Sequence, residues 1–420
     1  MSASMSNSSS HIPFDVQLEI LEYVKHDKNL LPTFSLVCRD WMPYCQKHLF
    51  KHINATSLDA QDKASWTSGN QVLNEGTVHT WNWNIIPPHL ASLVKNVTIK
   101  PPSAFWDSHC MPISISCEPL VSMLENLVNL ETLALKYLLF GGYDGFELVH
   151  IPNRHQLRLL DIDDCVGESR WHNFFSVFSR INNLKFRCFR FPASKGFDDP
   201  LHRHDKSRTR VSQISARSVN LAKLDLHISL ADLKSLRIFC RSTSLISMDD
   251  SFELLEHPEL ALDDLLIDMC QWEWFKVLPW GTIQHAFDLQ TKVPSFRLAV
   301  PFSFYSILEH PQMEMEIPRG IRYIIIRVLL PLFGFGERSW SVRRHWQSWA
   351  QCLDSLPALS HLTVTVEAQE ETFCYEASAT NRMDHVKEVM GIIEIELKRF
   401  RTRGILHVED ITDREDDFIL

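Results

Sequence analysis

The sequence predicts an α/β fold in which a short three-helix module precedes an irregular solenoid of parallel strands. Three helical patterns lie within residues 12–50, directly behind a Ser-rich beginning. From residue 88 onward, a motif of the form apolar-x-x-apolar-x-apolar recurs, and it predicts short buried strands. Helical patterns occupy several of the intervals between its copies. Strands that alternate with helices favour a parallel sheet built from consecutive units.

The first module contains three helical patterns that follow one another closely. Pro13 suits the first turn of a helix, where no backbone N–H is needed, and Val16, Ile20 and Val24 then share one face. Asn29 is a favourable N-cap, so we expect it to begin the second helix. Apolar residues of the second and third helices are Leu30, Leu31, Phe34, Leu36, Val37, Trp41, Tyr44, Cys45 and Leu49.

As a whole, this module resembles an F-box. That pattern opens with Leu-Pro, continues through Ile/Leu-Phe-x-x-Leu and Asp-Leu-Leu, and ends with Leu-Val-x-Arg-x-Trp. The chain departs from it at Ile12, at Asn29, and with prolines at 32 and 43. The segment from Trp41 onward resembles the F-boxes of mushroom-type fungi in particular. The matching residues are Ile12, Pro13, Ile20, Leu21, Val24, Asn29, Leu30, Leu31, Leu36, Val37, Arg39 and Trp41.

The resemblance implies a protein partner for the module. A free-standing domain this short is hard to stabilise alone, so a partner or the rest of the chain must cover its apolar face. An F-box docks on a Skp-type adaptor and, through it, on a cullin–RING ubiquitin ligase. The residues that we expect to bind the adaptor are Ile12, Pro13, Val16, Ile20, Leu30, Leu31, Leu36 and Val37.

Nine clear copies of the strand motif follow, and a weaker strand is expected around Ile405, Leu406 and Val408. The copies are Val94/Val97/Ile99, Leu130/Leu133/Leu135, Leu157/Leu160/Ile162, Ile181/Leu184/Phe186, Leu221/Leu224/Leu226, Leu262/Leu265/Ile267, Val293/Phe296/Leu298, Ile321/Ile324/Ile326 and Leu359/Leu362/Val364. Helices are expected at 120–127, 171–180, 230–240, 282–289, 342–353 and 381–400.

These alternating elements resemble a degenerate leucine-rich repeat domain, as found behind many fungal F-boxes. The spacing of the copies is irregular and the usual Asn after each strand is mostly missing, so another α/β arrangement with buried strands remains open. The expected organisation is a disordered beginning at 1–10, an F-box at 11–54, a connector at 55–87, a repeat domain at 88–410 and a C-terminal tail at 411–420.

Composition restricts the functional classes. The chain has 420 residues, 45% of them hydrophobic and 22% charged, which is ordinary for a soluble protein. Its formal net charge of -10 argues against a nucleic-acid partner. Ten cysteines without a C-x-x-C pair indicate free thiols in a reducing compartment. No signal peptide is recognisable, and the longest apolar run, 323–335, is too short to span a bilayer, so we expect a cytoplasmic or nuclear protein without a membrane partner.

Three motifs suggest chemistry, and each has a plainer interpretation. Asp161 and Asp163 could suggest a metal site, but strand alternation places them on the open face of a sheet. The basic stretch at 202–208 is typical of a solvated loop. Trp346 and Trp349 lie among arginines but share one helical face, which favours a place in the core. We therefore expect no catalytic residue, metal or cofactor.

The resemblance to an F-box implies a substrate-recognition subunit of a Skp–cullin–F-box ubiquitin ligase, which would act by proximity and orientation. A non-ligase interaction scaffold and an enzyme with dispersed site residues are the alternatives. The residues between the buried apolar positions should face outward and bind an unidentified target protein. This set is Asp161, Asp163, Lys185, Arg187, Asp225, His227, Asp268, Arg297 and Arg327, of which the three arginines are expected to be anchors.

Overall fold

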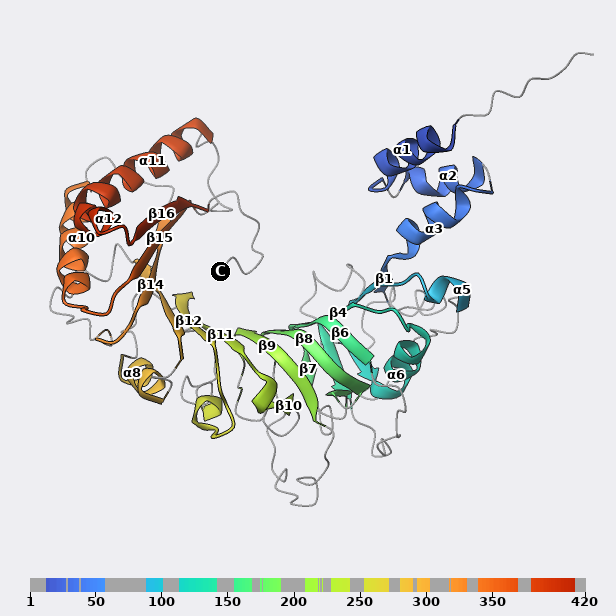
Figure 1. The fold of residues 1–420 in the computed structure, drawn as a ribbon, viewed down its shortest axis with the longest axis horizontal. Coiled ribbons are helices and arrows are strands. Elements are labelled where there is room, and N and C mark those ends of the chain that lie inside the picture. The colour runs from blue at the N-terminus through green and yellow to red at the C-terminus, as the bar shows by residue number, and fades with distance from the viewer. Residues whose placement is uncertain are drawn as a thin grey trace, which may run out of the picture. The chain divides into compact units, whose positions relative to one another are not determined.

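The structure, a computed structural model, divides into two compact units, Met1–Ser179 and Arg180–Leu420. Each unit combines α-helices with parallel β-strands (Figure 1). The predicted disordered beginning and nearly all of the predicted connector lie outside the described residues. These are 13–27, 29–37, 39–56, 88–100, 113–141, 155–167, 174–175, 177–189, 208–217, 219, 221, 228–241, 253–271, 280–289, 293–302, 317, 319–330, 339–368 and 379–411.

Three short helices open the first unit: α1 (Phe14–Val24), α2 (Leu30–Val37) and α3 (Met42–Phe50). The helix α2 begins directly after Asn29, as predicted, and the side chain of Asp27 contributes to capping it. The Asp27 carboxylate accepts hydrogen bonds from the backbone N–H groups of Asn29 at 2.9 Å and Leu30 at 3.2 Å. A carboxylate satisfies N–H groups that have no partner within the helix.

The three helices enclose a small core of their own. Trp41 is central to this core, because its ring stacks on Phe34 with the centroids 5.5 Å apart and its Nε1 donates a 2.7 Å hydrogen bond to Gln17 Oε1. The two contacts connect α1, α2 and the beginning of α3. The buried residues of the core are Leu21, Val24, Leu31, Trp41 and Cys45.

A parallel sheet follows α3 after a single connecting residue, Lys51. Its first strand, β1 (His52–Thr56), pairs with β2 (Asn96–Lys100), which is followed in the sheet by β4 (Thr132–Lys136) and β6 (His155–Asp163). The predicted boundary between residues 54 and 55 falls inside β1, so the module continues directly into the sheet. The other elements of this unit are α5 (Pro88–Ala91), α6 (Cys117–Asn126), β3 (Ile113–Ser116), β5 (Leu138–Gly141) and β7 (Val166–Gly167), and these three strands form a second parallel sheet.

The second unit contains a larger parallel sheet whose strands follow chain order, as predicted. A short strand, β10 (Ile228–Ser229), pairs with β9 beside the main path. The strands in spatial order are β8 (Phe178–Arg187, which begins two residues before this unit), β9 (Thr209–Arg217), β11 (Ser235–Arg241), β12 (Asp264–Gln271), β13 (Ser295–Phe302), β14 (Tyr323–Leu330), β15 (His361–Ala368) and β16 (Leu406–Asp410).

The predicted apolar positions form the buried side of these strands. In eight of the nine copies, the last two apolar residues lie in a strand and are at most 4% exposed. Equivalent positions of two neighbouring copies do not always pair. The middle residue of one copy, Ile324, pairs with Leu298, which is the last residue of its copy, and not with the middle residue Phe296. A shift of two residues keeps every side chain on its original face, so the buried side continues across it.

Two predicted helices differ from the structure. At 171–180, Phe174 and Phe175 form a short 3-10 turn and a strand begins at Phe178. At 230–240, a 3-10 turn (Leu230–Asp232) leads into β11. Apolar spacing of three residues fits both a helix and the strand motif, which explains both errors. Of the copy at 221–226, only Leu221 is described, and it is buried; the rest of this predicted strand lies outside the described residues.

The other predicted helices of this unit are present: α8 (Trp280–Leu289), α10 (Ser339–Asp354), and α11 (Ala379–Glu396) with α12 (Lys398–Thr402). Figure 1 shows α8, α10 and α11 on one side of the sheet. Trp346 and Trp349 are buried, at 0% and 2% exposure, as predicted. Gly404 ends the last helix with φ 72°, a conformation that favours glycine.

Candidate functional site

The helical module exposes large apolar side chains. Leu36 and Val37, at the end of α2, are 86% and 61% exposed, and Leu30 and Val16 are each 43% exposed. Leu30 and Val37 are seven residues apart in α2 and therefore lie on one face of that helix. We call these four side chains the apolar helix surface. Burial of a single leucine against a partner contributes about 1.5–3 kcal/mol, so this surface suits a protein contact.

The remaining residues predicted to bind the adaptor differ in position. Pro13 is exposed at the beginning of α1, and Ile20 is half-buried against the core of the module. Leu31 has no exposure, so it supports α2 from inside and is not available to a partner. Ile12 lies outside the described residues.

A polar contact connects α1 to α3 across this module. The Tyr44 hydroxyl donates a 2.7 Å hydrogen bond to the Glu22 carboxylate. Burial, followed by the bond to Glu22, raises the pKa of Tyr44 to about 12. Lys25, followed by Tyr44, lowers the pKa of Glu22. The same burial effect lowers the pKa of His48 in α3, which favours the neutral imidazole.

In the first unit, the predicted outward-facing acids lie opposite the buried positions of β6. Asp161 and Asp163 are half-buried, and their register partners in β4 are Ala134 and Lys136. The Lys136 Nζ lies 3.9 Å from the Asp163 carboxylate. One of the two acids therefore has a cationic neighbour within its own sheet.

In the second unit, the strand residues opposite the buried positions form a second face, which we call the charged sheet face. Its described charged members are Lys185, Arg187, Arg217, Arg237, Asp264, Asp268, Arg297, Arg327, His361, Glu367, His407 and Glu409. Two predicted members, Asp225 and His227, lie outside the described residues. On this face Tyr323 stacks on His361 with the ring centroids 4.5 Å apart.

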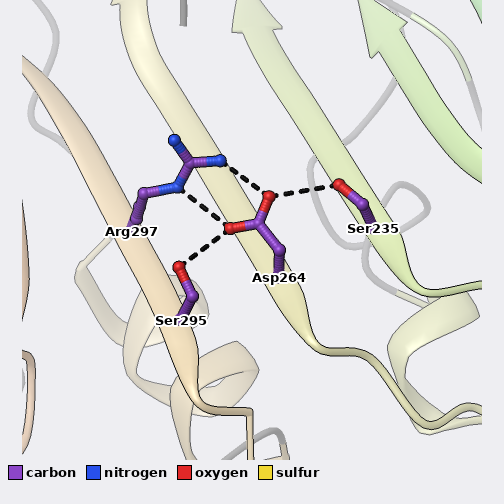
Figure 2. Close-up of polar contacts among 4 residues, drawn as sticks. All are labelled: Ser235, Asp264, Ser295 and Arg297. Carbon is purple, nitrogen blue, oxygen red and sulfur yellow. Dashed lines mark hydrogen bonds and ion pairs between the residues drawn. The ribbon is translucent and has the colours of Figure 1, made fainter.

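Asp264 is the centre of a polar network that spans three strands, β11, β12 and β13 (Figure 2). Its Oδ1 accepts hydrogen bonds from Arg297 Nε at 3.0 Å and from the Ser295 hydroxyl at 2.9 Å. Its Oδ2 accepts from Arg297 Nη2 at 2.7 Å and from the Ser235 hydroxyl at 3.1 Å. A bidentate pair of this kind holds the guanidinium in one orientation.

Two of the predicted arginine anchors are therefore already paired. Arg297 is held by Asp264, and Arg327 donates from Nε to Glu367 at 2.8 Å. Asp268 is 5% exposed, so it is not accessible as a contact residue in this structure. The face is also not uniformly polar, since it includes a buried apolar cluster of Leu266, Ala299 and Ile325. Arg187, the third predicted anchor, is half-buried.

Sequence reasoning missed Arg217 and Arg237, because it did not assign β9 and β11 as strands. The signal was present in the sequence. Val211, Ile214 and Ala216 have the spacing of the strand motif, as do Leu233, Leu236 and Ile238. Their exposures of 0–3% show that both triads are buried like the predicted ones. The second set was predicted to be part of a helix, and the first was not assigned to any element.

Three of the described thiols, those of Cys165, Cys240 and Cys352, lack the environment of a nucleophile. Burial raises the pKa of Cys165 to about 12, and it also raises the pKa of Cys240 and of Cys352. A reactive cysteine needs the opposite shift. Within the same residues, no group of three or more His, Cys, Asp or Glu side chains is arranged to hold a metal ion. In this part of the chain no helix has both the length and the apolar character needed to cross a membrane.

No protein-family model matches the chain, and no curated protein matches it in sequence. The structure establishes an α/β protein with a large parallel sheet and a separate set of N-terminal helices. Its interaction surfaces are therefore interpreted from their own chemistry.

Proposed function

We propose that the chain is the substrate-recognition subunit of a Skp–cullin–F-box ubiquitin ligase. In this proposal α1–α3 are an F-box that docks on a Skp-type adaptor. The strands of both units are a divergent leucine-rich repeat domain that captures a target protein. The protein contributes proximity and orientation, and the ligase and its charged ubiquitin enzyme supply the chemistry.

The observation that carries the proposal is the exposure of Leu36 and Val37 on a module with a complete core of its own. Leu21, Leu31 and Trp41 already fill that core. The exposed side chains at the end of α2 are therefore not part of this core. Their exposure favours a binding partner outside the described residues. Both lie in the Leu-Val segment on which the resemblance to an F-box rests.

The junction between helices and sheet supports an orienting role within the first unit. Only Lys51 separates α3 from β1. Its backbone carbonyl accepts hydrogen bonds from the N–H groups of Lys95 at 3.1 Å and Asn96 at 2.9 Å. A partner bound to the helices would therefore be held by a short, hydrogen-bonded connection to the first strands, rather than by a flexible tether.

Affinity purification of the tagged full chain from cells tests this proposal. We expect a Skp-type adaptor and a cullin among the purified proteins, and we expect both to disappear with Leu36→Asp. The matched control is Val128→Asp, since Val128 is 68% exposed in the same unit but outside the helices. If the adaptor is recovered without a cullin, a non-ligase scaffold replaces the proposal. If neither is recovered with the wild-type chain, the proposal is wrong.

A further inference from the structure

The last strand of the larger sheet lies at its edge. β16 pairs in parallel with β15, and among the described strands β15 is its only neighbour. The sequence of β16, LHVED, contains neither proline nor lysine, the residues that commonly protect the edge of a sheet. An edge of this kind is a template for pairing with a further strand.

The hydrogen bonds at the two ends of β16 show which of its main-chain groups point toward the edge. The carbonyl of Ile405 accepts a 2.8 Å hydrogen bond from β15, and the N–H of Ile411 donates a 3.0 Å hydrogen bond to β15. These odd-numbered residues therefore face β15. Since main-chain groups alternate in direction along a strand, the N–H and C=O groups of Leu406 and Val408 point toward the open edge.

The side chains of the same two residues are incompletely covered. Leu406 and Val408 continue the buried side of the sheet, but each of them is only half-buried. Their register partners in β15, Leu362 and Val364, have no exposure, and β15 has a strand on either side. An added strand with apolar residues at alternate positions would therefore complete the coverage of Leu406 and Val408.

From this edge we infer that β16 pairs with β16 of a second copy of the chain, antiparallel and about a twofold axis at His407. Leu406 of each copy then lies opposite Val408 of the other, and each such pair exchanges both of its main-chain hydrogen bonds. On the buried side, each copy supplies the leucine and the valine that cover the other's half-buried pair. A twofold contact of this kind is self-complementary and closed. It involves none of the residues proposed to bind the adaptor.

Neighbouring registers fit this strand less well. An axis between His407 and Val408 would set outward main-chain groups of one copy against groups of the other that face β15. An axis at Val408 would place each Leu406 opposite Asp410 of the second copy, on the apolar side. With the axis at His407, the two imidazoles meet on the charged sheet face, and each His407 Nε2 lies 3.8 Å from the Glu409 carboxylate of its own strand. These carboxylates limit the repulsion between the two rings when they are protonated.

Sedimentation velocity of the purified full-length chain tests the pairing. A contact of one short strand from each copy is small, so we expect a reversible dimer with a dissociation constant on the order of 10–100 micromolar. Val408→Pro removes an outward N–H that makes no bond to β15, and an edge strand tolerates proline at such a position, so this variant should weaken the dimer about tenfold or more. Val408→Thr keeps the N–H and the branched shape and should stay within about threefold of wild type. A wild-type chain that is monomeric up to about 200 micromolar, or equal dimerisation by Val408→Pro, would overturn the inference.

Cysteine crosslinking of the full-length chain tests the register, and it decides the question if Val408→Pro fails to fold. At a non-hydrogen-bonded position of an antiparallel pair the Cα atoms are about 4.5 Å apart, which a disulfide can bridge. His407→Cys should therefore give a covalent dimer on mild oxidation, whereas Asp384→Cys, at an exposed position of α11, should give no more than wild type.

Two other results would overturn this pairing. A covalent dimer through Val408→Cys, and not through His407→Cys, would move the axis to Val408 and contradict the proposed register. A dimer that appears only after deletion of residues 412–420 would identify the chain's own end as the occupant of the edge, in place of a second copy.

Discussion

The Arg297 guanidinium donates two hydrogen bonds to the Asp264 carboxylate of the neighbouring strand, at 3.0 Å from Nε and 2.7 Å from Nη2. Both side chains are about one-fifth exposed, at 21% and 23%. The pair lies beside Arg237, which shares the register partner Leu266 with Arg297. It commits Arg297 to the fold.

We predict that Asp264→Asn lowers the free energy of unfolding of the second unit by about 1–3 kcal/mol. The change removes the charge that stabilises Arg297 and leaves the nearby Arg237 with a cationic neighbour. Urea denaturation followed by circular dichroism measures the effect. Asp263→Asn is the control, since Asp263 is adjacent and exposed. Equal shifts for the two variants would show that the network has no special stabilising role.

Leu31 and Leu36 should differ strongly in their response to the same truncation. Leu31→Ala removes a fully buried side chain and should destabilise the helical module by about 2–5 kcal/mol. Leu36→Ala changes an exposed side chain and should alter stability by less than about 0.5 kcal/mol. Amide hydrogen exchange within α1–α3 measures both. Comparable acceleration of exchange in the two variants is the result that contradicts the described core.

Two glycines near the C-terminus should give effects of opposite sign. Gly404→Ala places a side chain at φ 72° and should destabilise the protein by about 1 kcal/mol, although no atom lies within 4 Å of the new Cβ. Gly391→Ala lies within α11 in open space and should stabilise it by about 0.5–1 kcal/mol. Thermal unfolding of the two variants compares them directly. A stabilising Gly404→Ala would argue against the left-handed end of this helix.

The Glu22–Tyr44 bond gives the helical module a defined pH dependence. The pKa of Tyr44 is raised from 10.0 to about 12. The contribution of Tyr44 to the free energy of unfolding is therefore complete below pH 10.0 and is lost as pH rises toward 12. The pKa of Glu22 is lowered from 4.5, so the stability that the Glu22 carboxylate contributes to the folded state is present above pH 4.5 and is lost as pH falls. Tyr44→Phe should therefore lose less stability than wild type between pH 9 and 11, measured by urea titration. Identical losses would mean that Tyr44 ionises normally.

The strands were predictable because buried parallel strands impose the same spacing wherever they occur. The spacing of Leu130, Leu133 and Leu135, for example, corresponds to β4 and its preceding turn. Helix and strand were confused where apolar residues recur every three positions, as from Leu230 to Leu236. At that spacing local sequence is ambiguous, and the hydrogen bonds of neighbouring strands decide the conformation.

The interaction surfaces were predictable only in part. Alternation placed Arg187, Arg297 and Arg327 on one face, but it could not indicate which of them have acidic partners on adjacent strands. Pairing with Asp264 or Glu367 depends on register, which the irregular copies do not define. In the same way, the F-box pattern did not distinguish buried Leu31 from exposed Leu30, because neighbouring residues of a helix point to different sides.

Direct titration of the purified chain with a purified Skp-type adaptor tests the proposed function most sharply. By isothermal calorimetry, we expect a one-to-one complex with a dissociation constant on the order of micromolar or tighter for wild type and for Val128→Asp. Leu36→Asp should abolish binding, because it places a charge in an apolar interface, while hydrogen exchange of α1–α3 stays unchanged. Absence of binding by the wild-type chain, or equal binding by Leu36→Asp, would contradict the assignment of α1–α3 as an adaptor-docking module.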